Sequence, residues 1–380
     1  MATGAPILLR RRNFQWYWNS APDPWPVREE QWQKYTDIEN EIIEDGHNQK
    51  RKEVEIDGNY VIDLKHQVQY KKGDSHKQRP IKRVQLDRDR SSLHLREERF
   101  SLPVPLATST QAIDDNRDVE MEILHVRIGR LGHFAAVYAE DHINNQGKSL
   151  ADVVQEAANG IIKEGSALNK EKEARWLAAQ LLAVKHFGLN IATDHMFRIP
   201  AEIGDTVVHM YTLETFLYKL VNSHGRHQFS VTNETVKTLG PFYLILQRYL
   251  FQIETKNFFT VYRGLSLTDE QRQLFMTKRL EFTAFTSTSK NRVKAEQFGD
   301  TLLVIDLEPE LSDGDTAEYC GSDIAHLSDF LNEEEFLIRT GTFFKFIKHE
   351  YNSKMKKHLI YLKSINGSNF LAADFMSRMS

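Results

Sequence analysis

The sequence predicts an α+β fold in two parts: a small unit of strands around one helix, then a larger unit with helices before a β core. Three observations lead to this prediction. Short aromatic or alternating runs separated by turn residues fill 13–84, which is typical of strands. Apolar residues recur three and four positions apart through 121–256, which is typical of helices. Short apolar runs then return in 258–365 and predict strands again.

Length and composition describe a globular chain with room for two domains. The 380 residues are 41% hydrophobic and 27% charged. The net charge of -4 gives no general attraction to nucleic acid or to a membrane, so neither is an expected partner. The single cysteine, Cys320, excludes an intramolecular disulfide and a cysteine-based zinc site. No apolar run has transmembrane or signal-peptide length, so we expect an intracellular protein, in the cytoplasm or the nucleus.

Turn residues divide the N-terminal unit into short elements. Prolines at 22, 24 and 26 break the chain after its first aromatic run. Asp57-Gly58-Asn59 separates two runs of alternating residues and predicts a hairpin. Ile38 and Ile42 form one stripe of a short helix. The predicted elements are strands at 14–18, 53–56, 60–64, 66–70 and 81–84 and a helix at 37–43.

A segment without periodicity, 85–120, separates the small unit from predicted helices. It holds runs of alternating charge and several prolines, which is typical of a linker. Beyond it, apolar stripes at 150–161, 174–184 and 213–221 predict helices, and Gly240-Pro241 is expected to begin another. Thr301 to Leu307 is a continuous apolar run that predicts a buried strand, and closing strands are expected at 342–347 and 359–365.

Three predicted strands of the β core each carry polar groups next to strongly apolar sequence. Arg263 shares a face with Phe259 and Val261, since side chains alternate along a strand. Glu333 and Glu335 are expected to share another face, roughly 7 Å apart. A guanidinium binds phosphate through paired hydrogen bonds. A carboxylate stabilises a cationic sugar centre during glycosyl transfer. Together with a hydroxyl turn at 287–289, these groups predict a cleft in the β core.

These motifs resemble those of a known enzyme family. Tyr262-Arg263-Gly264, Ser287-Thr288-Ser289 and Glu333-Glu334-Glu335 look like the three ordered motifs of the R-S-E ADP-ribosyltransferases, of the cholera-toxin-like, vertebrate arginine-transferase type. The resemblance runs from about residue 211 to 362. It implies a catalytic domain over 121–375, with a helical half before a β core split into two sheets. It also implies NAD as the co-substrate, and no metal.

The resemblance implies a role for each of these residues. Arg263 would bind the phosphates of NAD, and Gly264 would let the nicotinamide approach the backbone. Ser287 would orient the ribose and the catalytic acid. Glu335 would stabilise the oxocarbenium-like centre as nicotinamide leaves, and Glu333 would receive an arginine of the target protein. Glu334 should point to the opposite face and be structural.

The N-terminal residues 10–86 resemble a second family, the WWE domain, and 87–120 would then be the linker. The resemblance rests on Trp16 and Trp18, on Tyr60-Val61-Ile62-Asp63-Leu64 and on Arg79-Pro80-Ile81-Lys82-Arg83. It implies binding of poly- or iso-ADP-ribose through aromatic stacking and phosphate contacts. Gln67 departs from the family pattern, and the aromatic residues could equally form a small core. The binding residues implied are Trp32, Tyr35, Tyr60, Gln69, Arg79 and Arg83.

The sequence therefore predicts a mono-ADP-ribosyltransferase that modifies arginine and releases nicotinamide. Its WWE module would bind ADP-ribose on partners. Two alternatives remain: an NAD glycohydrolase, in which water is the acceptor, and a reader or scaffold without activity. No glycine-rich phosphate loop with lysine and no His-Glu-x-x-His helix is present, which argues against phosphoryl transfer and metallohydrolysis.

Overall fold

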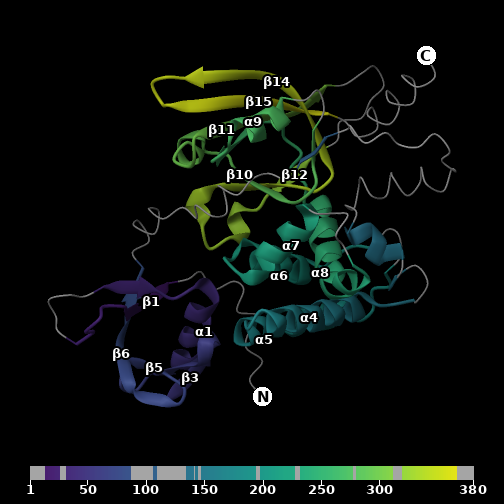
Figure 1. Ribbon diagram of the computed structural model, residues 1–380. Helices are drawn as coiled ribbons and strands as arrows, with labels where there is room; N and C mark the ends of the chain where they lie inside the picture. Colours follow the sequence, from purple (N-terminus) through teal and green to yellow (C-terminus); the bar gives the residue numbers. More distant parts are fainter. Residues whose placement is uncertain are drawn as a thin grey trace. The chain divides into compact units, whose positions relative to one another are not determined.

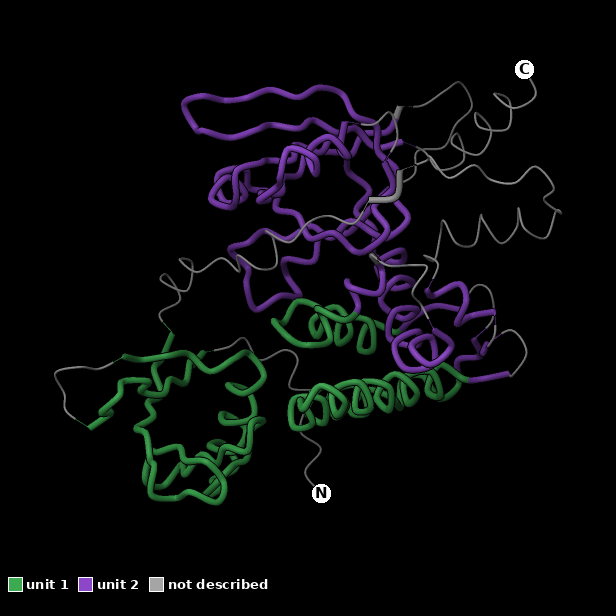
Figure 2. The backbone as a smooth tube through the Cα atoms, viewed as in Figure 1, with its two compact units in different colours: residues 1–94, 149–190, 200–220 green, residues 95–148, 191–199, 221–380 purple. Residues whose placement is uncertain are grey.

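The computed structural model divides into two compact units, which Figure 2 distinguishes by colour. Unit 1 comprises residues 1–94, 149–190 and 200–220, and unit 2 comprises 95–148, 191–199 and 221–380. Of the predicted linker at 87–120, only 106–108 lies among the described residues. The structure describes residues 13–25, 31–86, 106–108, 134–140, 142–143, 147–193, 197–226, 232–276, 280–310 and 319–365.

Unit 1 begins with a six-stranded antiparallel sheet of order β2-β1-β6-β5-β4-β3. Helix α1 packs against it, and Trp16, Tyr35, Ile43 and Ile62 meet in a buried core. The predicted strands and helix are therefore confirmed. The elements are β1 Phe14–Asn19, β2 Trp32–Lys34, α1 Asp37–Asn48, β3 Glu53–Ile56, β4 Tyr60–Asp63, β5 Val68–Lys71 and β6 Asp74–Gln85.

Local capping and turn chemistry explain where these elements begin and end. Thr36 and Glu39 form a capping box: the Thr36 side chain accepts from the backbone N–H of Glu39, and the Glu39 side chain accepts from the backbone N–H of Thr36. Helix α1 therefore begins at Asp37. The predicted hairpin joins β3 to β4 through the turn Asp57–Asn59. Gly58 has φ +75° and Asn59 has φ +61°, the left-handed conformation that these residue types tolerate best.

Three further helices belong to unit 1. Ser149 caps the first of them, and Gly165 lets it approach the next, because a Cβ at Gly165 would lie 2.4 Å from the Cβ of Ala174. The stripe expected to include Leu213 is interrupted: Leu213 lies between two helices with extended backbone. These helices are α4 Leu150–Ala167, α5 Glu171–Val184 and α6 Ala201–Thr212, and α7 Phe216–Arg226 follows them.

Helix α8 (Asn233–Gln252) begins seven residues before the position expected from Gly240-Pro241, so that prediction is wrong. Thr232 and Thr235 form the capping box that starts the helix. Pro241 lies in the interior and removes one backbone donor there. Gly240 packs against Tyr138, whose Cβ lies 2.7 Å from the position of an added Cβ. Gly240 and Pro241 therefore lie inside the helix, and Gly240 makes room there for the packing of Tyr138.

Unit 2 contains a nine-stranded mixed sheet of order β12-β13-β10-β8-β11-β15-β14-β9-β7. Its two parts, β12-β13-β10 and β8 through β7, meet through a single residue pair, Ser289 opposite Tyr262. The sheet is thus one hydrogen-bonded series with a narrow join, and the α+β class is confirmed. The strands are β7 Leu106–Thr108, β8 Thr260–Leu265, β9 Leu280–Phe282, β10 Thr286–Ser289, β11 Thr301–Glu310, β12 Gly321–Asp323, β13 Glu335–Ile338, β14 Thr342–Asn352 and β15 Lys357–Ile365.

Strand β7 was not expected, because its sequence lies in the predicted linker. It pairs with β9 at the edge of the sheet. Strands β14 and β15 form a long hairpin (Figure 1), extending beyond the closing strands that the sequence predicted. β11 matches its prediction and runs parallel to β15.

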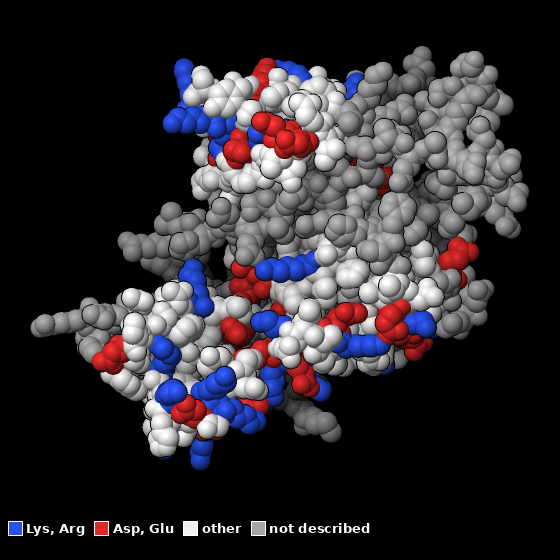
Figure 3. All heavy atoms as spheres, in the orientation of Figure 1, with Lys and Arg blue, Asp and Glu red and all other residues white. Residues whose placement is uncertain are grey.

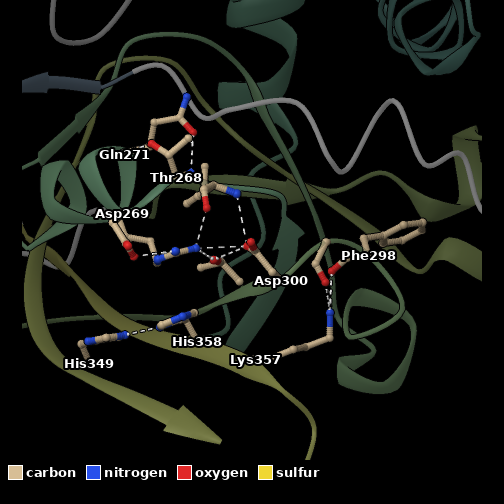
Figure 4. A network of polar contacts seen from close by, with 12 residues as sticks. Thr268, Asp269, Gln271, Phe298, Asp300, His349, Lys357 and His358 are labelled. Carbon is tan, nitrogen blue, oxygen red and sulfur yellow. Dashed lines mark hydrogen bonds and ion pairs between the residues drawn. The ribbon is translucent and has the colours of Figure 1, made fainter.

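Helix α9 (Asp269–Phe275) is fixed to the sheet by a buried guanidinium. Arg272 donates to the carbonyl of Leu267 and to the hydroxyl of Thr301, and it pairs with Asp269 at 2.7 Å and Asp300 at 3.3 Å. Figure 4 shows this network with Asp269 and Asp300 in place. A buried charge with this many partners is compensated, so the arginine stabilises the connection after β8.

The surface and the helices give two further observations. Lys and Arg alternate with Asp and Glu over the described surface seen in Figure 3, in agreement with the small net charge. Among the described residues, no helix is long and apolar enough to cross a membrane.

Candidate active site

The three strands that carry the predicted catalytic motifs are neighbours in the sheet of unit 2. β10 lies between β13 and β8. Ser289 is opposite Glu335 in one neighbour and opposite Tyr262 in the other. The arginine, hydroxyl and acid motifs, far apart in the sequence, therefore meet at the narrow join of the sheet.

Arg263 is a buried cation in β8, with a side chain only 4% exposed. It lies opposite Leu303 and shares its face with Val261 and Leu265, as the alternation along the strand predicts. Its Nη1 donates to the carbonyl oxygen of Ser287 at 2.6 Å. This bond ties the arginine motif directly to the hydroxyl motif.

The three hydroxyls of the motif Ser287-Thr288-Ser289, which lies in β10, differ in their partners. Thr288 Oγ1 donates to the carbonyl of Phe336, and Ser289 Oγ donates to the carbonyl of Glu333, both at 2.7 Å. Ser287 Oγ is buried and has no hydrogen-bond partner among the described residues. A buried hydroxyl without a partner costs about 1–3 kcal/mol, so it calls for an explanation such as a ligand.

The two predicted acids are both buried, but not as parts of one strand. Glu335 is the first residue of β13 and is 0% exposed, whereas Glu333 ends the 3₁₀ turn Leu331–Glu333 and is 2% exposed. Glu334 between them has φ +48°. The strand expected over 333–338 therefore starts two residues later, and strand alternation does not place these acids on a shared face. Instead, the chain turns between the two acids at Glu334, which has the left-handed conformation.

Glu334 is held outside the buried pair. Its Oε1 accepts from Asn291 Nδ2 at 3.0 Å and from Lys294 Nζ at 3.2 Å. The hydrogen bond from Asn291 lowers the pKa of Glu334, and Lys294 lowers it further, while burial opposes the shift. Glu334 is therefore an anchored carboxylate.

Gly264 has a reason within the chain itself. A Cβ at this position would lie 2.2 Å from the carbonyl oxygen of Ala295 and 2.7 Å from that of Phe298. These atoms belong to the segment around helix α10 (Arg292–Ala295), which packs against β8. Close packing of α10 therefore accounts for the glycine without a ligand.

Three of the residues implied for ADP-ribose binding lie together: Gln69 and Arg79 in the N-terminal sheet, and Tyr35 just after β2. Tyr35 donates its hydroxyl to Gln69 Oε1 at 2.8 Å, and both are buried. Burial raises the pKa of Tyr35, so the phenol keeps its proton. Gln69 lies opposite Arg79 in the sheet. Arg79 Nη1 donates to the carbonyls of Asn19 and Ala21, at 2.9 and 2.7 Å.

The other residues implied for this site have different surroundings. Tyr60 is 39% exposed and lies opposite Lys71, and the ring of Trp32 stacks under the ammonium of Lys82 at 3.9 Å. Arg83 pairs with Glu44 at 2.6 Å. That ion pair is partly exposed and joins β6 to Glu44 of helix α1, and among the described residues no hydrogen bond or ion pair links Arg83 to Tyr35, Gln69 or Arg79.

Glu44 also accepts from Trp16 Nε1 at 2.9 Å. Burial acts to raise the pKa of Glu44, but the hydrogen bonds from Arg83 and Trp16 together lower it. The carboxylate therefore stays charged beside α1. The ion pair of Arg83 with Glu44 therefore links β6 to α1 within the N-terminal domain.

Sequence reasoning missed the residues that follow the hydroxyl motif. Lys290, Asn291 and Lys294 contact the acid motif through backbone and side chain. The available signal was Asn291, whose side chain accepts from the N–H of Lys294 and so begins α10. Among the described residues, no group of three His, Cys, Asp or Glu could hold a metal ion.

Several solved structures resemble this chain. The type III effector XopAI of Xanthomonas axonopodis pv. citri is 16% identical, with 70% of this chain and 96% of that chain covered and a TM-score of 0.40. The ADP-ribosyltransferase HopU1 of Pseudomonas syringae pv. Tomato DC3000 is 23% identical, with 43% and 77% covered and a TM-score of 0.36. Exoenzyme S of Pseudomonas aeruginosa, solved with human 14-3-3 protein beta and carba-NAD, is 16% identical, with 55% and 88% covered and a TM-score of 0.36.

Two family models match the sequence, and no curated protein does. The model described as WWE domain matches residues 14–83. The model described as NAD:arginine ADP-ribosyltransferase matches residues 152–369, which is more than half of the chain. The second match contains β8, β10 and β13 and their three motifs.

Proposed function

Because the chain belongs to the NAD:arginine ADP-ribosyltransferase family, whose substrate is NAD, we propose that it transfers ADP-ribose from NAD to arginine side chains of proteins. In this reaction the bond between the ribose and nicotinamide breaks, and a bond forms between the ribose carbon and a guanidinium nitrogen. Nicotinamide leaves, and the guanidinium loses a proton. The observation that supports the proposal most is the hydroxyl of Ser287, which is buried where the arginine and acid motifs meet and has no partner among the described residues.

NAD brings groups that suit this site. Arg263, whose guanidinium also holds the carbonyl of Ser287, would bind a phosphate oxygen. The Ser287 hydroxyl would donate to a ribose oxygen and so gain the partner that the described residues do not supply. Glu335 would stabilise the positive charge that develops on the ribose as nicotinamide departs. Its burial strengthens this effect, because solvent screens the charge less.

We assign the acceptor step to Glu333. A carboxylate holds a guanidinium through paired hydrogen bonds and accepts its proton. Glu333 is buried two residues from Glu335, so both acids belong to one short stretch of chain. Water as acceptor would need no such second acid.

The test measures two products from labelled NAD and a small guanidino acceptor. We expect Glu333→Gln to lower the transfer of ADP-ribose about tenfold or more while nicotinamide release falls much less, because only the acceptor step loses its carboxylate. Equal losses of both products would contradict the role of Glu333. Label found only as free ADP-ribose with the wild-type protein would identify an NAD glycohydrolase. A protein that releases no nicotinamide would instead be a reader or scaffold.

We further propose that the WWE domain binds iso-ADP-ribose, with the exposed ring of Tyr60 stacking on the adenine. Gln69 and Arg79, which lie opposite each other on β5 and β6, would contact the phosphates. Isothermal titration calorimetry with iso-ADP-ribose is the test. Tyr60→Ala should weaken binding about tenfold or more, since stacking on a base contributes ~1–3 kcal/mol. Tyr351→Ala, an exposed tyrosine of β14, is the matched control. No binding to the wild-type protein would reject this part of the proposal.

Arg79→Ala is a less clean variant than Tyr60→Ala. Arg79 holds the carbonyls of Asn19 and Ala21, so its loss disturbs the chain after β1 as well as any phosphate contact. A Lys at this position keeps a charge but not the fork of donors. Tyr60→Ala therefore tests ligand binding with less change to the fold.

A further inference from the structure

The loop that carries the acid motif is fastened by the segment that follows the hydroxyl motif. We call residues 332–334 the acid loop. Three consecutive carbonyl oxygens of this loop each accept a hydrogen bond from a different residue of 289–294. The donors are Lys294 Nζ to the carbonyl of Asn332, Ser289 Oγ to that of Glu333 at 2.7 Å, and the Lys290 N–H to that of Glu334 at 3.0 Å.

A side-chain anchor completes the fastening at Glu334. Its carboxylate accepts from Asn291 and from Lys294, so Lys294 bonds to the loop on both sides of Glu333. Lys294 itself is only partly exposed, and charge-assisted hydrogen bonds of this kind are stronger than neutral ones. Lys294 therefore holds the residues on both sides of Glu333 through bonds that do not involve the Glu333 side chain.

This anchor opposes a backbone strain. Glu334 has φ +48°, a left-handed conformation that costs a residue with a Cβ about 1–2 kcal/mol. The conformation turns the chain between the 3₁₀ turn and β13, and this turn lets Glu333 and Glu335 both be buried. Without the anchor, the strain favours an extended chain at Glu334, and Glu333 would move.

We propose that Lys294 and Glu334 are positioning residues that fix Glu333 for the acceptor, an inference that rests on the proposed function. Neither residue touches the reacting atoms; both act through the acid loop. Glu335 depends on them less, because β13 is paired with β10 on one side and β12 on the other. Loss of the anchor should therefore impair transfer to arginine more than the release of nicotinamide.

The experiment compares Lys294→Met, Lys294→Arg and Arg292→Met in the full-length chain. Lys294→Met keeps the apolar stem and removes the charge. We expect it to lower ADP-ribose transferred per nicotinamide released about tenfold and to raise the KM for the guanidino acceptor, because small displacements at a reacting centre have large effects. Lys294→Arg should restore most of the ratio. Arg292, on the same short helix, pairs with Glu296 and does not reach the loop, so Arg292→Met should behave as wild type.

A second pair of variants separates the anchor from the backbone strain. Glu334→Gly and Glu334→Ala both remove the carboxylate, but glycine tolerates the positive φ. Both should lower the ratio of transfer to nicotinamide release, and the glycine variant should be the more stable to urea. A ratio unchanged from wild type in Lys294→Met and in Glu334→Gly would overturn the proposal.

Hydrogen–deuterium exchange gives a readout that does not depend on activity. The Lys290 N–H donates to Glu334, and the Glu334 N–H donates to Leu331. Both amides should exchange faster in Lys294→Met than in wild type or in Arg292→Met. The two proposals can fail separately. Absence of nicotinamide release by wild type would reject the proposed function. Unchanged amide exchange in Lys294→Met would reject the anchor, whatever the activity of the protein.

Discussion

At the scale of single residues, Ser287 and Thr288 make opposite contributions to stability and activity. Ser287→Ala removes a buried hydroxyl that has no partner among the described residues, so no internal hydrogen bond is lost. We expect the free energy of unfolding to change by no more than ~0.5 kcal/mol or to rise, while nicotinamide release falls about tenfold or more. Urea denaturation and a nicotinamide assay measure the two effects.

Thr288→Val is the matched control for this prediction. It removes the bond from Thr288 Oγ1 to the carbonyl of Phe336, which joins β10 to β13. The variant should lose about 1 kcal/mol of stability. A Ser287→Ala protein with full activity and reduced stability would show that this hydroxyl serves the fold.

Glu281 predicts a pH dependence of stability. Glu281 lies in β9, which pairs with β14 and β7, and burial raises the pKa of its carboxyl from the ordinary 4.5 to about 6. A raised acid pKa stabilises the folded state below about pH 4.5, and this contribution is lost as the pH rises through about 6. Glu281→Gln should therefore be more stable than wild type by ~1–2 kcal/mol at pH 7 and show no such gain at pH 4.

Unfolding by urea between pH 4 and 8 measures this difference. Glu308→Gln, at an exposed position of β11, provides the comparison: it keeps Glu281, so its stability should follow that of wild type across this range. A constant gap between wild type and Glu281→Gln across this range would mean that the carboxyl is not buried as described.

At the scale of elements, helix α5 takes its N-terminal cap from the WWE domain. Lys170 at the N-cap supplies no side-chain bond, and the carboxylate of Asp57 accepts from the N–H groups of Lys172 and Glu173, at 2.8 and 3.0 Å. An acidic cap satisfies free donors and favours the positive end of the helix. All these residues belong to unit 1.

Asp57→Ala should therefore lower the free energy of unfolding by ~1–2 kcal/mol, the usual cost of a lost cap. Denaturation of the full-length chain by urea, followed by circular dichroism, measures it. Asp74→Ala removes a partly exposed carboxylate whose ion pair among the described residues is with highly exposed Lys77, and should change stability by less than ~0.5 kcal/mol. Equal midpoints for wild type and Asp57→Ala would show that the cap contributes nothing.

The same scale shows how far sequence patterns reach. Alternation and turn residues predicted β1, β3, β4 and β11, because each element is specified by its own residues. They failed at α8, where a capping box overrides Gly240-Pro241, and at Glu334, whose left-handed conformation depends on partners 40 residues away. Strand β7 was missed because it has only three residues, too few for a pattern of alternation. It forms through its pairing with β9 at the edge of the sheet.

At the scale of the whole molecule, two tertiary features escaped prediction. The chain order of helices and strands gave the α+β class, but not that α4, α5 and α6 group with the WWE domain in one compact unit. The residue motifs predicted a shared site, but not the single pair through which Ser289 and Tyr262 join the two parts of the sheet among the described residues. Both features depend on contacts between distant segments, which local periodicity does not encode.

The central claim is that Arg263, Ser287 and Glu335 act together on NAD. Its most direct test is nicotinamide release from NAD by the full-length chain, with wild type compared with Glu335→Gln and with Glu350→Gln, an exposed carboxylate of β14. We predict release by wild type, an unchanged rate in Glu350→Gln and a loss of at least about 100-fold in Glu335→Gln. Equal rates in wild type and a folded Glu335→Gln protein would contradict the account.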